Sequence, residues 1–172
     1  VLPRDRVICQ GLTHHEHERD AWEWLQKQLP GHGPYRAAAF FEFKERGGRL
    51  YEVDALVIGS HAIYLLEMKD WRGRIRANGI DWQITQDGYT FTRTNPYSLI
   101  NHKAKVLKTL LTERGKLHGS QVPRVEALVF LTHPDVRAEL NEWHMDHVVT
   151  RHTVMDAIRS GRFPGVHPRH TE

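Results

Sequence analysis

Apolar residues recur along this chain at two spacings, one typical of helices and the other of buried strands. Residues 13–29 place apolar side chains three and four positions apart, which predicts an amphipathic helix with Thr13 as its N-cap. The same spacing predicts a long helix over about 97–116, after an Asn-Pro pair, and a shorter one over 153–160. Each predicted helix has one apolar face with which to cover a sheet.

Runs of aliphatic, β-branched and aromatic residues predict the strands. Three follow the first helix, at 36–44, 50–58 and 62–68, and Gly47-Gly48 forms a hairpin turn between the first two. Further strands are expected as a small meander within 71–94 and as buried strands at 125–131 and 148–149. This order predicts an α/β fold in which a mixed central sheet is flanked by helices.

The length and composition fit a single domain. The chain has 172 residues, of which 40% are hydrophobic and 26% charged. We expect an extended lead-in over 1–12, one domain over 13–165 and a tail over 166–172. The abrupt ends suggest a domain of a longer protein.

Charge and cysteine content limit the possible partners and the cellular compartment of the protein. The formal net charge of +3 permits a polyanionic partner without requiring one. One cysteine, Cys9, excludes a disulfide framework and suits a reducing cytosol, so we expect a cytoplasmic protein. No apolar run approaches the length of a membrane span, and no membrane partner is expected.

Two acidic residues interrupt the apolar strands. Asp54 lies within VDALVI and Glu67 within YLLEMK, and the tight connection between these strands makes them hairpin neighbours. Burying carboxylates is unfavourable unless something pairs with them, and a hard cation such as Mg²⁺ does so. Lys69 follows Glu67 by two positions, so both side chains project from the same face of a strand.

This trio predicts a divalent-metal site for phosphodiester hydrolysis. Asp54 and Glu67 hold the ion, with the backbone carbonyl of Met68 as a further ligand, and Lys69 orients water or stabilises developing negative charge. Two alternatives stay open. An E-x-K triplet alone is more often a solvated edge or a salt bridge, and a buried Asp can bond to backbone amides.

Four stretches together resemble a known family. They are ERDAWEWL from Glu18, YEVDALVIGSHAIYLLEMKDWRG from Tyr51, a tryptophan at Trp82, and NPYSLINHKAKVL from Asn95. From about Glu18 to about Leu131 the chain resembles the NERD (nuclease-related) domain of the PD-(D/E)xK nuclease superfamily. The resemblance implies a restriction-endonuclease-like fold, Mg²⁺ or Mn²⁺ as cofactor, DNA rather than RNA as substrate, and a longer parent such as a phage-defence kinase.

The resemblance also assigns site residues. It implies Asp54 and Glu67 as metal ligands, Lys69 as the catalytic lysine, and Glu18 as the acid of the first helix, with Glu16 as a rival. One position departs from the family pattern, since the family's Gln falls near Leu99. Three polar residues of the next turn are candidates to replace it: Asn101, His102 and Lys103.

This departure leaves three functions open. The domain is a metal-dependent nuclease, or a weak or inactive module that targets a larger kinase or helicase protein to nucleic acid, or a structural domain in which the acids form internal salt bridges. Expected phosphate contacts are Lys103, Lys105, Arg72 and Arg74, with solubilising charge as the alternative. Trp71 and Trp82 either stack on bases or fill the core. The histidines His14, His15 and His17 form a polar helix start or a weak metal-binding tract.

Overall fold

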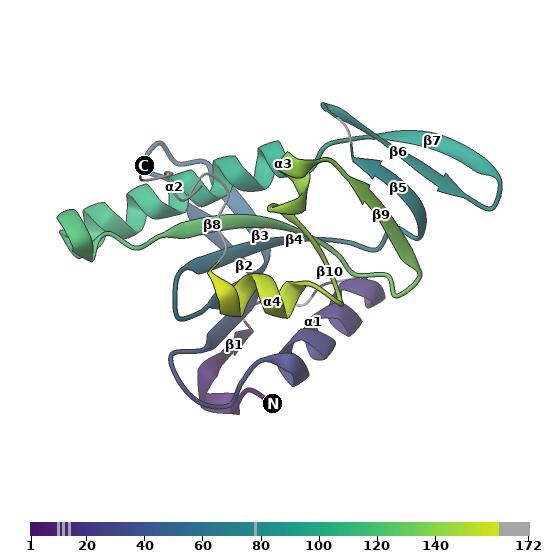
Figure 1. The fold of residues 1–172 in the computed structure, drawn as a ribbon. Coiled ribbons are helices and arrows are strands. Elements are labelled where there is room, and N and C mark those ends of the chain that lie inside the picture. Colours follow the sequence, from purple (N-terminus) through teal and green to yellow (C-terminus); the bar gives the residue numbers. More distant parts are fainter. Residues whose placement is uncertain (10, 12, 14, 78, 162–172) are drawn as a thin grey trace, which may run out of the picture.

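The computed structural model describes residues 1–9, 11, 13, 15–77 and 79–161, and its centre is a six-stranded mixed sheet (Figure 1). The strand order is β1-β2-β3-β4-β8-β10. The strands β2, β3 and β4 run antiparallel, whereas β1 lies parallel to β2, and β4, β8 and β10 lie parallel to one another. Their bounds are β1 Val7–Cys9, β2 Arg36–Lys44, β3 Leu50–Ile58, β4 Ile63–Lys69, β8 Val125–Leu131 and β10 Val148–Thr150.

A second sheet of four strands, in the order β7-β6-β5-β9, projects from one side of the first (Figure 1). It contains β5 (Gly73–Ala77), β6 (Asp81–Gln86), β7 (Tyr89–Thr94) and β9 (Val136–Leu140). The meander predicted within 71–94 is therefore confirmed, but the sequence did not predict β9. Its five residues, VRAEL, are all half-buried or exposed, so they lack the apolar run of a buried strand.

Helices cover both faces of the central sheet, which confirms the predicted α/β fold. The helices α1 (Glu16–Gln28) and α4 (Val154–Ser160) pack on one face, and α2 (Tyr97–Gly115) packs on the other (Figure 1). The short helix α3 (Glu142–Met145) precedes β10, and 3-10 turns span Arg4–Arg6 and Gly119–Gln121. Among the described residues, no helix is both long and apolar enough to cross a membrane.

The central strands are apolar because both of their faces are buried. In β4, Leu66 joins the core cluster beneath α1, and its neighbour Leu65 joins the cluster beneath α2. Any acid within such a strand has to find a partner inside the protein.

The first residues of the chain, for which the sequence predicted an extended lead-in, contain a 3-10 turn and the strand β1, which is part of the sheet. β1 forms its edge by pairing with β2, Leu2 is buried in the core, and the Leu2 amide donates to the Gln26 carbonyl at 3.1 Å. The side chains of β1 are half-buried or exposed, so the sequence gives little sign of a strand here. The predicted tail at 166–172 lies outside the described residues.

In the β2–β3 pair, the face of the sheet to which alternate side chains point changes at Phe40 and Asp54. Residues two apart on a regular strand share a face. Ala55 nevertheless packs beneath α1 while Val53 packs on the α2 side, and β2 makes the same exchange around Phe40. Phe40 has a φ of 51°, in the left-handed region that non-glycine residues rarely adopt. The exchange places Asp54 at the bend rather than within a regular ladder.

Gly73, four residues after Lys69, is at a position that requires glycine. Its φ is 83°, and a Cβ atom there would lie 2.3 Å from the carbonyl oxygen of Thr85 in β6. We expect Gly73→Ala to lower the free energy of unfolding by about 2 kcal/mol, because it combines backbone strain with a clash against backbone. Urea denaturation measures this. Gly79→Ala is the matched control, with a φ of 70° and no atom within 4 Å. Equal losses in both variants would contradict the role of the clash.

Candidate active site

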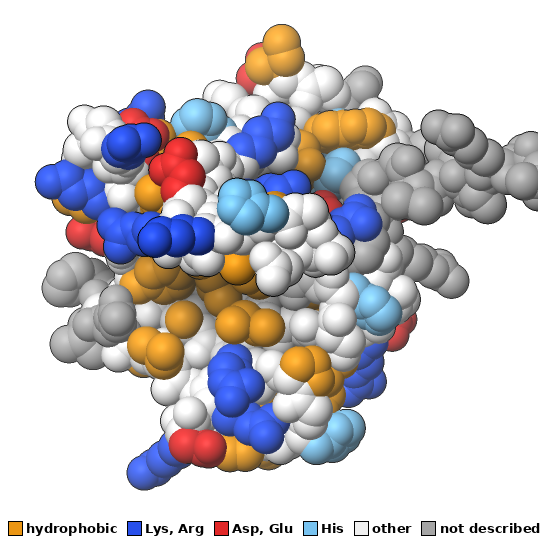
Figure 2. Space-filling view, turned by 90° about the vertical axis from the view of Figure 1, so that its left-hand side faces the viewer, with side chains coloured by type: hydrophobic (Ala, Val, Ile, Leu, Met, Phe, Trp, Pro, Cys, Tyr) orange, Lys and Arg blue, Asp and Glu red, His pale blue; other side chains and the backbone are white. Residues whose placement is uncertain are grey.

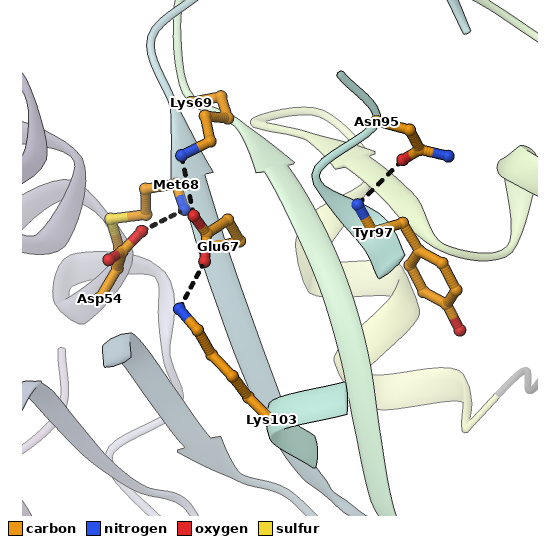
Figure 3. Close-up of polar contacts among 7 residues, drawn as sticks. All are labelled: Asp54, Glu67, Met68, Lys69, Asn95, Tyr97 and Lys103. Carbon is orange, nitrogen blue, oxygen red and sulfur yellow. Dashed lines mark hydrogen bonds and ion pairs between the residues drawn. The ribbon is translucent and has the colours of Figure 1, made fainter. Parts of the chain in front are cut away.

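Asp54 and Glu67 lie where the pairing of β3 with β4 ends. The last residues paired there are Ala55 and Leu66, and the next residue on each strand is one of the two acids. Asp54 Oδ2 accepts a hydrogen bond of 2.7 Å from the backbone N–H of Met68 (Figure 3). The carboxylate thus takes the place of a ladder bond and brings the charge of β3 beside β4. The amide contact considered as an alternative for Asp54 is present, and it orients this carboxylate toward Glu67.

Glu67 is held between two lysines. Lys69 Nζ donates to Oε1 at 2.8 Å, and Lys103 Nζ donates to Oε2 at 3.1 Å (Figure 3). Both Glu67 and Lys103 are only 8% exposed. Each oxygen of this buried carboxylate therefore has its own ammonium partner.

Lys103 lies inside the site, whereas the sequence predicted it as a contact to nucleic-acid phosphates. Its position shares one stripe of α2 with the buried residues Ile100, Ala104 and Leu107, and this stripe packs on the sheet. A lysine within an apolar helix stripe is the signal that could have revealed this burial. The contact with Glu67 joins residues 36 positions apart.

The position that departs from the family pattern is not part of the site. Leu99 is 47% exposed. Of the three candidates to replace the family's Gln, Asn101 is half-buried and the His102 Nε2 atom lies 3.1 Å from the hydroxyl of Tyr51. Lys103 is the one whose side chain contacts Glu67.

The structure brings Glu18, rather than Glu16, toward Asp54. Glu18 and Asp54 line one open cleft of about 680 Å³, whereas Glu16 pairs with Arg19 at 3.8 Å on the exposed side of α1. The hydroxyl of Thr13 donates to the Glu18 carboxylate. The prediction of Thr13 as N-cap is wrong, because α1 begins at Glu16 with His15 as its N-cap and Thr13 instead supports the acid in the cleft.

The two central acids titrate differently. Burial, followed by the negative charge of Glu67, raises the pKa of Asp54 to about 6. Burial by itself also raises the pKa of Glu67, but the charges and hydrogen bonds of Lys69 and Lys103 outweigh it and lower the Glu67 pKa. Asp54 is therefore the more readily protonated of the two acids.

The comparison with known proteins shows the family to which this chain belongs. The sequence pattern of the nuclease-related domain, NERD, matches residues 13–132, which contain both acids and both lysines. This chain belongs to the NERD family. A relative, the probable kinase PglW of Streptomyces coelicolor, is 34% identical over 145 residues. That match covers 84% of this chain and 9% of the relative, so the chain spans about a tenth of that protein's length.

The donor set of this NERD domain fits a hard divalent ion. In the part of the chain that the structure describes, no group of three or more His, Cys, Asp or Glu side chains forms a metal-binding cluster. Two carboxylates and a backbone carbonyl are sufficient for Mg²⁺, which keeps several waters. The N–H and carbonyl of a strand residue face the same neighbour, so the Met68 carbonyl faces the Asp54 side, as its N–H does.

The other predicted nucleic-acid contacts of the NERD domain lie on its surface. Arg72 pairs with Asp87, Arg74 pairs with Glu139 at 2.5 Å, and Lys105 is exposed on α2. On the face shown in Figure 2, Lys and Arg side chains are spread more widely than Asp and Glu side chains.

The remaining candidates are buried in the core, half-buried or exposed, and His15 among them lines the same cleft as Glu18 and Asp54. Trp82 is fully buried, and its ring meets that of Trp71 edge-on with centroids 6.0 Å apart, so Trp82 belongs to the core. His15 and His17 are exposed with ring centroids 5.5 Å apart, and His14 lies outside the described residues. Cys9 is exposed and unbridged.

Proposed function

We propose that this domain hydrolyses phosphodiester bonds of DNA, rather than RNA, with Mg²⁺ or Mn²⁺ as cofactor. The observation that supports this is the meeting of Asp54 and Glu67 at the end of the β3–β4 ladder, with Lys69 Nζ 2.8 Å from Glu67 Oε1. Asp54, Glu67 and the Met68 carbonyl would hold the ion. When bound, a divalent ion supplies charge neutralisation at the phosphate and makes a water more acidic.

The chain's own residues divide the remaining tasks. Lys69, which Glu67 orients, stabilises the negative charge that develops on the phosphate oxygens or positions the attacking water. Glu18 acts from the cleft side of Asp54 through water. Exposed Lys105 contacts the phosphate backbone, while Arg72 and Arg74 reach it only after leaving their acidic partners.

Lys69→Ala tests the enzymatic function. We expect the rate of Mn²⁺-dependent DNA cleavage to fall on the order of 10²-fold, because the variant removes one donor at the developing charge. Nicking of a circular DNA substrate measures the rate. Glu67 keeps Lys103 as a partner, so the fold should persist and circular dichroism should be unchanged.

The control is Lys27→Ala, which removes an exposed lysine from the last turn of α1. Cleavage that is equal in the wild type and Lys69→Ala, or that persists in Asp54→Asn, would refute the proposal.

A second candidate is a targeting module that binds nucleic acid without cutting it. Two observations favour it: the relative of which this chain spans 9% is a probable kinase, and Leu99 stands where the family's Gln is expected. A longer parent, whether a kinase of a phage-defence system or a helicase, stays a proposal, as does the cytoplasmic location. In this case DNA affinity would weaken with salt, and no cleavage would occur at any Mn²⁺ concentration.

If the domain has only a structural role, the experiments would give a third pattern of results. The domain would show no nucleic-acid affinity at all, while substitutions at Asp54 and Glu67 would change its stability. Binding and cleavage measured side by side therefore separate the three functions.

A further inference from the structure

Lys103 is a buried lysine that contacts one of the two central acids of the site. Its ammonium group is buried beneath α2 and bonds to the oxygen of Glu67 that Lys69 leaves free. A buried ammonium is unfavourable without a charged partner, and Glu67 supplies that partner. The result is a carboxylate with a positive charge at each of its two oxygens (Figure 3).

The charge of the site depends on this lysine. Asp54 and Glu67, with Glu18 across the cleft, contribute three negative charges, and Lys69 and Lys103 contribute two positive ones. One divalent ion together with one phosphodiester group brings the remaining single negative charge to neutrality. A second divalent ion would leave two uncompensated positive charges in a largely buried place, where like charges repel strongly.

We propose that Lys103 is a resident cation of the site: it occupies Glu67 Oε2 in place of a second divalent ion and so restricts the site to one ion. This inference rests on the proposed metal-dependent function. Lys103 is a positioning residue here, since it acts through Glu67 and reaches the site from a helix rather than from the E-x-K strand. A neutral residue with similar hydrogen-bonding ability would still hold the Glu67 side chain, but it would lack the positive charge that excludes a second ion.

The number and affinity of bound Mn²⁺ ions test this inference without any cleavage measurement. Electron paramagnetic resonance and titration calorimetry are applied to the folded domain without nucleic acid, near neutral pH. We expect one Mn²⁺ in the wild type, lost in Asp54→Asn. In Lys103→Gln we expect about tenfold or more tighter binding and a second ion, because a neighbouring positive charge has been removed.

Two further variants keep the result clear. Lys108→Gln makes the same charge change five residues along α2, on an exposed side chain, and should bind Mn²⁺ as the wild type does. Lys103→Met removes the charge with a side chain of similar length and serves where the Gln variant does not fold.

The outcomes also separate this inference from the proposed function. If the wild type binds one Mn²⁺ through Asp54 but both Lys103 variants bind it with unchanged number and affinity, Lys103 is only structural and the inference fails alone. If neither the wild type nor a Lys103 variant binds Mn²⁺ in an Asp54-dependent way, the metal-dependent function fails with it. Binding seen only in the Lys103 variants supports the inference.

Discussion

Glu67→Ala is expected to lower the free energy of unfolding by about 3–5 kcal/mol, which is a large part of the stability of a small domain. The reason is the lysine that it leaves behind. Lys103 is buried, and its Nζ donates to Glu67 Oε2 at 3.1 Å. Without that carboxylate, an ammonium group stays in the interior with no compensating charge. Urea denaturation near neutral pH measures the loss.

A double-mutant cycle tests whether this loss of stability comes from Lys103 left without its carboxylate partner. Lys103→Met combined with Glu67→Ala removes both charges, and we expect it to recover most of the stability, since a buried ion pair replaced by apolar groups is often neutral or better. Lys69 is more exposed than Lys103, with 29% of its side chain accessible, so it can turn to solvent in either variant. A double variant as unstable as Glu67→Ala would show that the carboxylate itself, rather than its partner, stabilises the fold.

Asp54→Asn is expected to stabilise the domain above about pH 6, by roughly 3 kcal/mol. The pKa of Asp54 is raised from 3.8 to about 6, first by burial and then by the charge of Glu67, and one pKa unit corresponds to about 1.4 kcal/mol. The folded protein thus holds this proton more tightly than the unfolded chain does. Ionised Asp54 therefore destabilises the fold above its folded pKa, and this effect disappears as the pH falls below about 4.

The measurement is urea denaturation of both proteins across this pH range. The Asn side chain can still accept the Met68 N–H, so the local structure should persist and the two stabilities should converge near pH 4. Asp20→Asn, on the exposed surface of α1, is the control and should show no such trend. A stability difference that is independent of pH would contradict the assignment to the Asp54 charge. Mn²⁺ should stabilise the wild type near neutral pH but not Asp54→Asn, because only the ionised carboxylate binds it.

The sequence by itself determined the elements and the chemistry that they present. Buried strands and helix stripes follow from spacing, because a residue's neighbours along the chain decide which face of an element is apolar. Asp54 and Glu67 stood out for the same reason, as acids within apolar strands. The tight β3–β4 connection then fixed them as neighbours, and the residues that resemble the NERD family lie within the matched range 13–132.

Contacts between distant segments were decided only by the tertiary structure. β9 pairs with β5 across about sixty residues, and β1 forms the edge of the central sheet. Both strands are too short and too exposed to be predicted from the sequence pattern. The choice of Glu18 over Glu16 depends on which side of α1 faces the cleft, because a difference of two positions turns a helical side chain to nearly the opposite side.

The pairing of Glu67 with Lys103 shows most directly why such contacts cannot be predicted from the sequence. The sequence places Lys69 beside it by strand geometry, but Lys103 reaches it only because α2 packs across β4 and turns one lysine inward. Local patterns specify which side of an element is buried, whereas the pairing of one buried charge with another depends on how whole elements dock. The raised pKa of Asp54 follows from the same docking, since burial and the nearby charge of Glu67 exist only in the folded protein.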